Sequence, residues 1–144
     1  MIEQTRVTAR VARRFDASPG RVFDAWLDPD TASRWLFTSP TSETHSTELD
    51  ARVGGKWRIS DRRGGVDYMA LGEYLEIDRP RRLVFSFGMP QFSPLFSRVC
   101  VAIEPDGSGC ILTLTQEGVA ASDREGLELG WGDMFDQLAA ALAG

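Results

Sequence analysis

The chain has 144 residues, a length typical of one domain, and its 42% hydrophobic and 26% charged residues are ordinary for a globular protein. A net charge of −5 argues against a nucleic-acid surface, which usually carries a basic stripe. No apolar signal peptide begins the sequence, and no run approaches the roughly 18 apolar residues of a membrane span. We therefore expect one cytoplasmic domain, residues 1–144, with no nucleic-acid partner and no membrane span.

The amino-terminal part predicts a strand followed by two short helices. Apolar side chains alternate along residues 5–15, which favours a strand. Ser18 can accept a hydrogen bond as the N-cap of the next helix, and Pro19 suits its first position. An Asp-Pro pair then ends this helix and begins a second one within residues 28–36. The side chains that can share one face of the second helix are Ala32, Trp35 and Leu36.

Six further strands are predicted for the middle of the chain, because alternating segments are separated by turns rich in Gly, Pro and Asp. Their predicted bounds are 42–49, 56–62, 66–77, 82–87, 97–104 and 110–117. In the last hairpin, a symmetric loop would pair Val101 with Leu112. Cys100 and Cys110 would then lie on opposite faces, so we expect no disulfide between them.

The carboxy-terminal segment predicts the longest helix. Ser122 and Glu125 have the spacing of a capping box, in which each side chain bonds a free backbone N–H. The apolar stripe that follows consists of Leu127, Trp131, Met134, Phe135, Leu138 and Leu142. Gly130 and Gly132 each cost about 1 kcal/mol relative to alanine in a helix interior. We therefore expect that the sheet or a ligand approaches them closely while Trp131 points inward.

Several motifs recur in a characteristic order along nearly the whole chain. They are residues 15–19 (FDASP), 28–29 (DP), 50–57 (DARVGGKW), 72–77 (GEYLEI), 82–85 (RLVF) and 130–131 (GW). In this order they resemble the activator-of-Hsp90-ATPase homologue-like proteins of the START superfamily. The resemblance implies an α+β helix-grip fold, in which a curved antiparallel sheet of about seven strands wraps around a long carboxy-terminal helix. Two short helices follow the first strand, and a cavity lies between sheet and helix.

Members of this superfamily hold lipids, sterols, polyketides or other apolar molecules in that cavity. The resemblance therefore implies non-catalytic binding of a small apolar ligand by a monomer or a homodimer. One alternative is an enzyme like the polyketide cyclases and aromatases, in which Arg52, Tyr68 and Glu73 would polarise the substrate or move protons. The other alternative is a chaperone-assisting or protein-interaction module, which would need an exposed apolar patch.

We expect no cofactor, no metal and no catalytic residue. His45 is the only histidine and lies among hydroxyl side chains, and one His with two divergent Cys cannot supply the four ligands of a structural zinc. Paired arginines such as Arg62 and Arg63 are interpreted as solvated surface. The residues expected to line the cavity are Trp35, Arg52, Trp57, Tyr68, Phe85, Phe87, Leu112, Leu114, Trp131 and Phe135.

Two questions at this cavity stay open in the sequence. Asp50 and Arg52 share strand parity, so we favour an ion pair that fixes the adjacent Gly-Gly turn over an Arg52 that binds a ligand carboxylate. Parity does not decide whether Tyr74 or Leu75 faces the cavity.

Overall fold

One antiparallel sheet of seven strands, in the order β1-β7-β6-β5-β4-β3-β2, forms the frame of the molecule. The computed structural model describes residues 6–38 and 42–143. The strands are β1 (Arg6–Phe15), β2 (Thr44–Leu49), β3 (Lys56–Arg63), β4 (Val66–Asp78), β5 (Arg82–Phe87), β6 (Ser97–Asp106) and β7 (Gly109–Ala120). The helices are α1 (Pro19–Leu27), α2 (Pro29–Ala32), a 3-10 turn η1 (Ala121–Asp123) and α3 (Arg124–Ala143).

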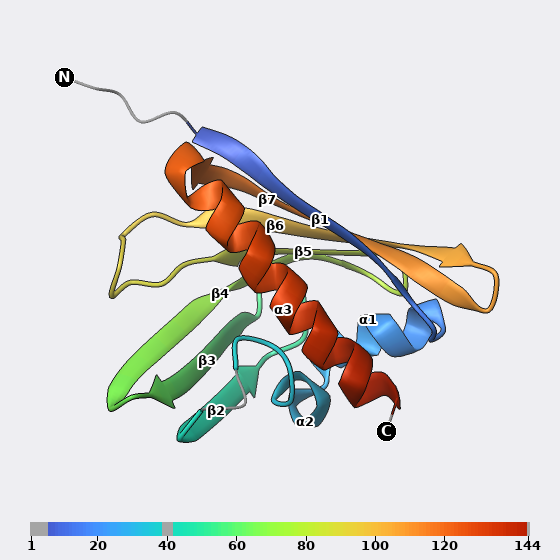
Figure 1. Cartoon of the computed structure of the whole chain (residues 1–144), viewed down its shortest axis with the longest axis horizontal. Helices are drawn as coiled ribbons and strands as arrows, with labels where there is room; N and C mark the ends of the chain where they lie inside the picture. Colours follow the sequence, from blue (N-terminus) through green and yellow to red (C-terminus); the bar gives the residue numbers. More distant parts are fainter. Residues whose placement is uncertain (1–5, 39–41, 144) are drawn as a thin grey trace.

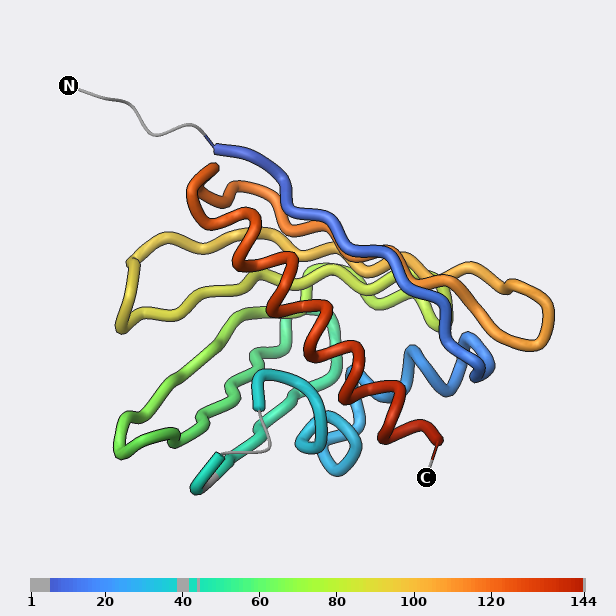
Figure 2. Tube along the Cα trace, in the orientation of Figure 1, coloured from blue at the N-terminus to red at the C-terminus, as the bar shows by residue number. Residues whose placement is uncertain are grey.

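The first strand is added at the edge of what is otherwise a meander, next to the last strand. Strands β2 to β7 pair in chain order, and β1 pairs antiparallel with β7, so segments from opposite ends of the sequence lie side by side (Figure 2). Helix α3 crosses one face of the sheet, and α1 and α2 lie near one end of α3 (Figure 1). The α+β helix-grip fold expected from the sequence is thereby confirmed.

Large aromatic side chains fill the space between α3, the two short helices and the sheet. Trp26 of α1 and Trp35 meet edge to face, with 4.7 Å between ring centroids. Phe135 of α3 is fully buried against both of them and against Phe15 of β1. This aromatic core holds α3 against the sheet, because each ring buries a large apolar area.

The first helix begins as predicted, and the second is shorter than predicted. The Ser18 hydroxyl accepts a backbone hydrogen bond of 3.3 Å, and Pro19 occupies the first turn of α1. Helix α2 ends at Ala32, so Trp35 lies in the turn that follows instead of on a helical face. Trp35 is nevertheless buried, and its indole N–H donates a 3.0 Å hydrogen bond to the Ala25 carbonyl.

The β6–β7 hairpin has a register two residues away from the predicted one. Val101 pairs with Leu114, where the symmetric loop would have paired it with Leu112. The chain turns in the two residues after Asp106, where Gly107 has φ of 59°, a left-handed conformation that glycine adopts freely. Because the shift is an even number of residues, every side chain keeps its predicted face. Both cysteines are free, as expected.

The Gly-Gly turn between β2 and β3 is hydrogen-bonded to β4 at Tyr74, which is the residue that faces inward there. Gly54 N–H donates to the Tyr74 carbonyl (2.8 Å), and Tyr74 N–H donates to the Gly55 carbonyl (2.9 Å). A Cβ at Gly55 would lie 2.1 Å from the Asp50 carbonyl oxygen, so only glycine fits there. Tyr74 is 3% exposed, and Leu75, beside a β-bulge, is 43% exposed.

Helix α3 differs from its prediction in two details. Ser122 lies inside the 3-10 turn η1, so the α-helix begins at Arg124, one residue later than a capping box would place it. A Cβ at Gly130 or Gly132 would meet no atom within 4 Å, so the predicted close approach of the sheet is wrong. Most of the inward stripe is confirmed: Trp131, Phe135 and Leu138 are buried, and Met134 and Leu142 pack against the core. Leu127 is half-buried and lies outside the core.

Candidate functional site

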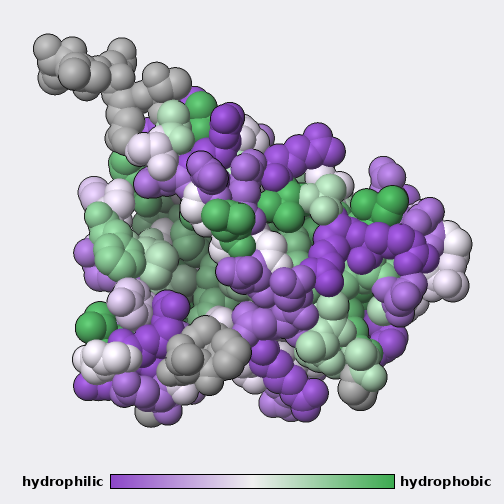
Figure 3. Space-filling model, viewed as in Figure 1, coloured by the Kyte–Doolittle hydropathy of each residue, from purple (hydrophilic) through white to green (hydrophobic). Residues whose placement is uncertain are grey.

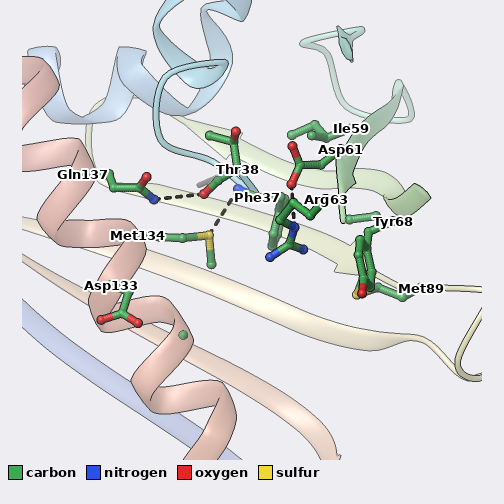
Figure 4. A pocket seen from close by; sticks show the side chains of 12 residues that line it. Phe37, Thr38, Ile59, Asp61, Arg63, Tyr68, Met89, Asp133, Met134 and Gln137 are labelled. Atoms are coloured by element: carbon green, nitrogen blue, oxygen red, sulfur yellow. Dashed lines mark hydrogen bonds and ion pairs between the residues drawn. The ribbon is translucent and has the colours of Figure 1, made fainter. Parts of the chain in front are cut away.

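A pocket of about 480 Å³ lies between α3 and the strands β3 and β4 (Figure 4). Its volume falls in the range of roughly 300–1,000 Å³ that small-molecule sites occupy. The apolar part of its wall consists of Phe37, Ile59, Ala70, Met89, Gly130 and Met134. The polar part consists of Thr38, Asp61, Arg63, Tyr68, Asp133 and Gln137. Figure 3 shows the hollow beside α3, with apolar residues at its base.

Strand alternation places the residues of the sheet wall. Residues 57, 59 and 61 of β3 are buried in turn, because every second side chain of a strand points to the same face. The pairing of β3 with β4 sets Ile59 opposite Ala70 and Asp61 opposite Tyr68. An acidic side chain therefore stands at an inward position that hydrophobic residues occupy elsewhere on the strand.

Asp61 and Arg63 form an ion pair on this wall. Asp61 is 3% exposed, and Nε of Arg63 lies 2.8 Å from its Oδ2. Apart from this ion pair, neither carboxylate oxygen has a hydrogen-bond partner among the residues that the structure describes. The Arg63 guanidinium also lies over the ring of Tyr68, 4.5 Å from its centroid. Burial of a carboxylate is costly unless a countercharge accompanies it, so Asp61 depends on Arg63.

The opposite wall belongs to α3 and to the loop that follows α2. Gln137 donates a 3.0 Å hydrogen bond to the Thr38 carbonyl, and the Phe37 N–H donates to the sulfur of Met134 at 3.2 Å. These two bonds fasten the loop to the helix and fix this side of the pocket. Asp133, the other polar side chain that α3 contributes to the pocket wall, is exposed to solvent.

Of the ten residues expected to line the cavity, the structure places Tyr68 on the pocket wall. Arg52 is exposed at the Gly-Gly turn, where its Nε donates to Asp50 at 2.9 Å, the pairing that we favoured. The other eight lie in the core or pack against it: Trp35, Trp57, Phe85, Phe87, Leu112, Leu114, Trp131 and Phe135. Their rings pack against one another and leave a residual space of about 10 Å³.

Trp131 illustrates why these residues do not line the pocket. Its indole N–H donates a 2.9 Å hydrogen bond to Gln116, whose amide nitrogen in turn donates to Ser97 at 2.8 Å. The ring is 2% exposed and lies 5.4 Å from the ring of Phe37, which covers it on the pocket side. Phe37, from the loop after α2, thus takes the position at the pocket that the sequence suggested for Trp131.

The residues of the cyclase-like alternative do not converge. Tyr68 lines the pocket, whereas Arg52 is exposed at the turn and Glu73 is a half-buried residue outside the pocket wall. Burial raises the pKa of the Cys110 thiol, which disfavours the thiolate that a nucleophile requires. No group of three His, Cys, Asp or Glu side chains within residues 6–38 and 42–143 could hold a metal ion.

Asp61 and Arg63 are the site residues that sequence reasoning missed. Arg63 was interpreted as part of a solvated arginine pair, and Asp61 was not singled out. One signal was present: Asp61 has the same strand parity as Trp57 and Ile59, so an inward acid was foreseeable.

No helix in the described part of the chain is long and apolar enough to cross a membrane.

Comparisons with known proteins agree with this architecture. Residues 16–143 match the family model described as activator of Hsp90 ATPase homolog 1-like protein. Protein CV1439 from Chromobacterium violaceum is 30% identical, with a TM-score of 0.84 over 92% of this chain and 94% of that one. No curated protein matches the sequence.

Two more distant solved structures share the fold. A protein from Arthrobacter aurescens is 23% identical, with a TM-score of 0.81 over 94% of this chain and 86% of its own. Protein SA2116 from Staphylococcus aureus, described as of unknown function, is 19% identical, with a TM-score of 0.80 over 98% and 96% of the two chains. Because the family model spans most of the sequence and a relative at 30% identity covers it, the chain belongs to the activator of Hsp90 ATPase homolog 1-like family.

Proposed function

We propose that this protein binds a small, largely apolar molecule in the pocket between α3 and strands β3 and β4, and does not transform it. The observation that carries the proposal is the pocket itself. The aromatic core is tightly filled, yet about 480 Å³ beside it stays open with mainly apolar walls. A ligand site needs such a concave apolar surface with a few polar groups for orientation, and Asp61, Arg63 and Tyr68 supply those groups on one side.

The two interior glycines of α3 offer a matched test. Gly130 lines the pocket and Gly132 does not, although a Cβ would meet open space at both. Leucine at either position raises helix propensity by a similar amount. Only Gly130→Leu would place an isobutyl group inside the pocket.

Isothermal titration with 1-decanol, a neutral apolar alcohol, separates the two variants. We expect Gly130→Leu to weaken binding at least about tenfold, because the new side chain occupies volume that the alcohol needs. Gly132→Leu should bind like the unmodified protein. Equal affinity in all three proteins would contradict a ligand site at this pocket, as would no binding of the alcohol to the unmodified protein.

An exposed apolar loop favours the interaction-module alternative as a second candidate. The segment between β5 and β6 carries Phe92, Leu95 and Phe96, which are 66%, 55% and 50% exposed. Such a group of large apolar side chains on a surface is typical of a contact site. Sedimentation equilibrium of the unmodified protein and of Leu95→Glu tests whether a second copy covers it: a dimer that the substitution dissociates supports this candidate, and a monomer in both cases counts against self-association.

A further inference from the structure

Asp61 is a charged residue at a buried position on a face of the sheet that otherwise carries apolar side chains. Its side chain is 2% exposed, and neighbouring inward positions of the same sheet hold the apolar residues Ile59 and Ala70. A buried carboxylate that has no hydrogen-bond partner among the described residues apart from an ion pair destabilises the fold unless something offsets it. Among the described residues, its one charged contact is Arg63, at 2.8 Å. The feature that this acid secures is therefore the position of the arginine.

Arg63 is fixed on one edge and one face of its guanidinium. Asp61 holds the Nε edge, and the ring of Tyr68 supports the planar face at 4.5 Å. Neither terminal nitrogen donates a hydrogen bond to any residue in the part of the chain that the structure describes. The side chain is 43% exposed, and Figure 4 shows the guanidinium pointing into the pocket. A pair of unused N–H groups is thus presented to the ligand space.

The fork of two parallel N–H groups matches the two oxygens of a carboxylate. Asp61 and Arg63 compensate each other's charge, so a ligand carboxylate would be held by the two unused N–H groups of the guanidinium. The other acid of the pocket wall, Asp133, lies in solvent that screens its charge. The neighbouring Arg62 differs from Arg63 because its guanidinium pairs with Glu43 and Asp67 outside the pocket.

We propose that Arg63 anchors the carboxylate of an apolar carboxylic acid in this pocket, and that Asp61 is the positioning residue that holds the guanidinium in place. The proposal rests on the proposed function, because it names the chemical class of the ligand that the same pocket binds. An apolar tail would lie along the apolar part of the pocket wall, which includes Met89 and Met134.

Three ten-carbon compounds that differ only in the head group test this assignment: decanoate, 1-decanol and decylamine. Titration calorimetry gives their dissociation constants for the unmodified protein, for Arg63→Gln and for Arg62→Gln as the matched control. We expect decanoate to bind at least about tenfold more tightly than the alcohol, the gain that a charged hydrogen bond supplies, and decylamine to bind most weakly. Arg63→Gln should remove the preference for decanoate over the alcohol, whereas Arg62→Gln, at an exposed residue outside the pocket wall, should leave both dissociation constants unchanged.

Loss of Arg63 leaves Asp61 as a buried unpaired charge, so the single variant can unfold. The double variant Asp61→Asn/Arg63→Gln removes both charges, and its circular dichroism spectrum shows whether the fold is kept. It should bind the alcohol and have no preference for decanoate.

The proposal is overturned if decanoate binds no better than the alcohol, if decylamine binds most tightly, or if Arg62→Gln has the same effect as Arg63→Gln. In each of these cases binding of 1-decanol would still support the pocket as a ligand site. If the unmodified protein binds none of the three compounds, the proposed function itself fails.

Discussion

Truncation of Phe135 to alanine tests how α3 is held on the sheet. Phe135 is fully buried, and its ring centroid lies 6.0 to 6.3 Å from those of four other rings: Phe15, Trp26, Trp35 and Trp131. Truncation of such a residue removes its transfer free energy and leaves a cavity, at a combined cost of about 3–5 kcal/mol. A domain of this kind is stable by only about 5–15 kcal/mol, so the variant should lose a large part of its stability.

Urea unfolding monitored by circular dichroism measures this loss. We expect the midpoint to fall while the slope of the free energy against urea stays constant, because the surface exposed on unfolding is nearly unchanged. Leu129→Ala on the same helix is the control, since Leu129 is 65% exposed and its truncation should cost less than about 0.5 kcal/mol. A loss below about 1 kcal/mol for Phe135→Ala would refute the account of a helix held by its aromatic face.

Three further expectations concern groups away from the pocket. Arg52→Ala should lower the free energy of unfolding by at most about 1 kcal/mol and leave binding of 1-decanol unchanged, because its ion pair is exposed; weaker binding would contradict this. The bidentate contact of Arg79 lowers the pKa of Asp24, so its stabilisation is present above the ordinary aspartate pKa of about 3.9 and is lost as pH falls through the lower folded value. Asp24→Asn should therefore cost more stability at pH 6 than at pH 2, and an equal cost would be inconsistent with the pair. Finally, a thiol reagent should label half-buried Cys100 before Cys110, which is buried and has a raised pKa; a faster Cys110 would show that the sheet opens there.

Local sequence patterns were sufficient to predict most of the strands and helices of the fold. Alternation located all seven strands, because one face of this sheet is buried and the other is solvated, so each strand carries a period of two. The Ser-Pro start of α1 was predictable since both residues act through their own backbone neighbours. The stripe of α3 was predictable for the same reason, since a helix period depends on sequence spacing alone.

Features that depend on how residues far apart in the sequence pack together were not predictable in this way. The β6–β7 register depends on where the chain turns, and a loop one residue further along gives the same inward faces. Aromatic residues such as Trp131 and Phe85 face inward as expected, but whether inward rings fill a cavity or line it depends on all of them together.

The candidate site was the least predictable part. Its position depends on the loop after α2, where Phe37 has φ of 51° and covers Trp131, an arrangement with no signature in local sequence spacing. Arg63 looked like surface because its neighbour Arg62 has the same chemistry. The two differ only in the face of the strand to which they point, and the buried Asp61 on the same face is the residue that distinguishes them.

The methionine methyl groups can report directly on the claim that a small apolar molecule binds in the pocket beside α3. Met89 and Met134 line the pocket, and Met69 on β4 does not. In ¹³C-methyl-methionine spectra, assigned by Met→Leu substitution, addition of 1-decanol should shift the signals of Met89 and Met134 together and leave that of Met69 in place. Shifts confined to Met69, or three signals that do not move under saturating alcohol, would contradict the claim.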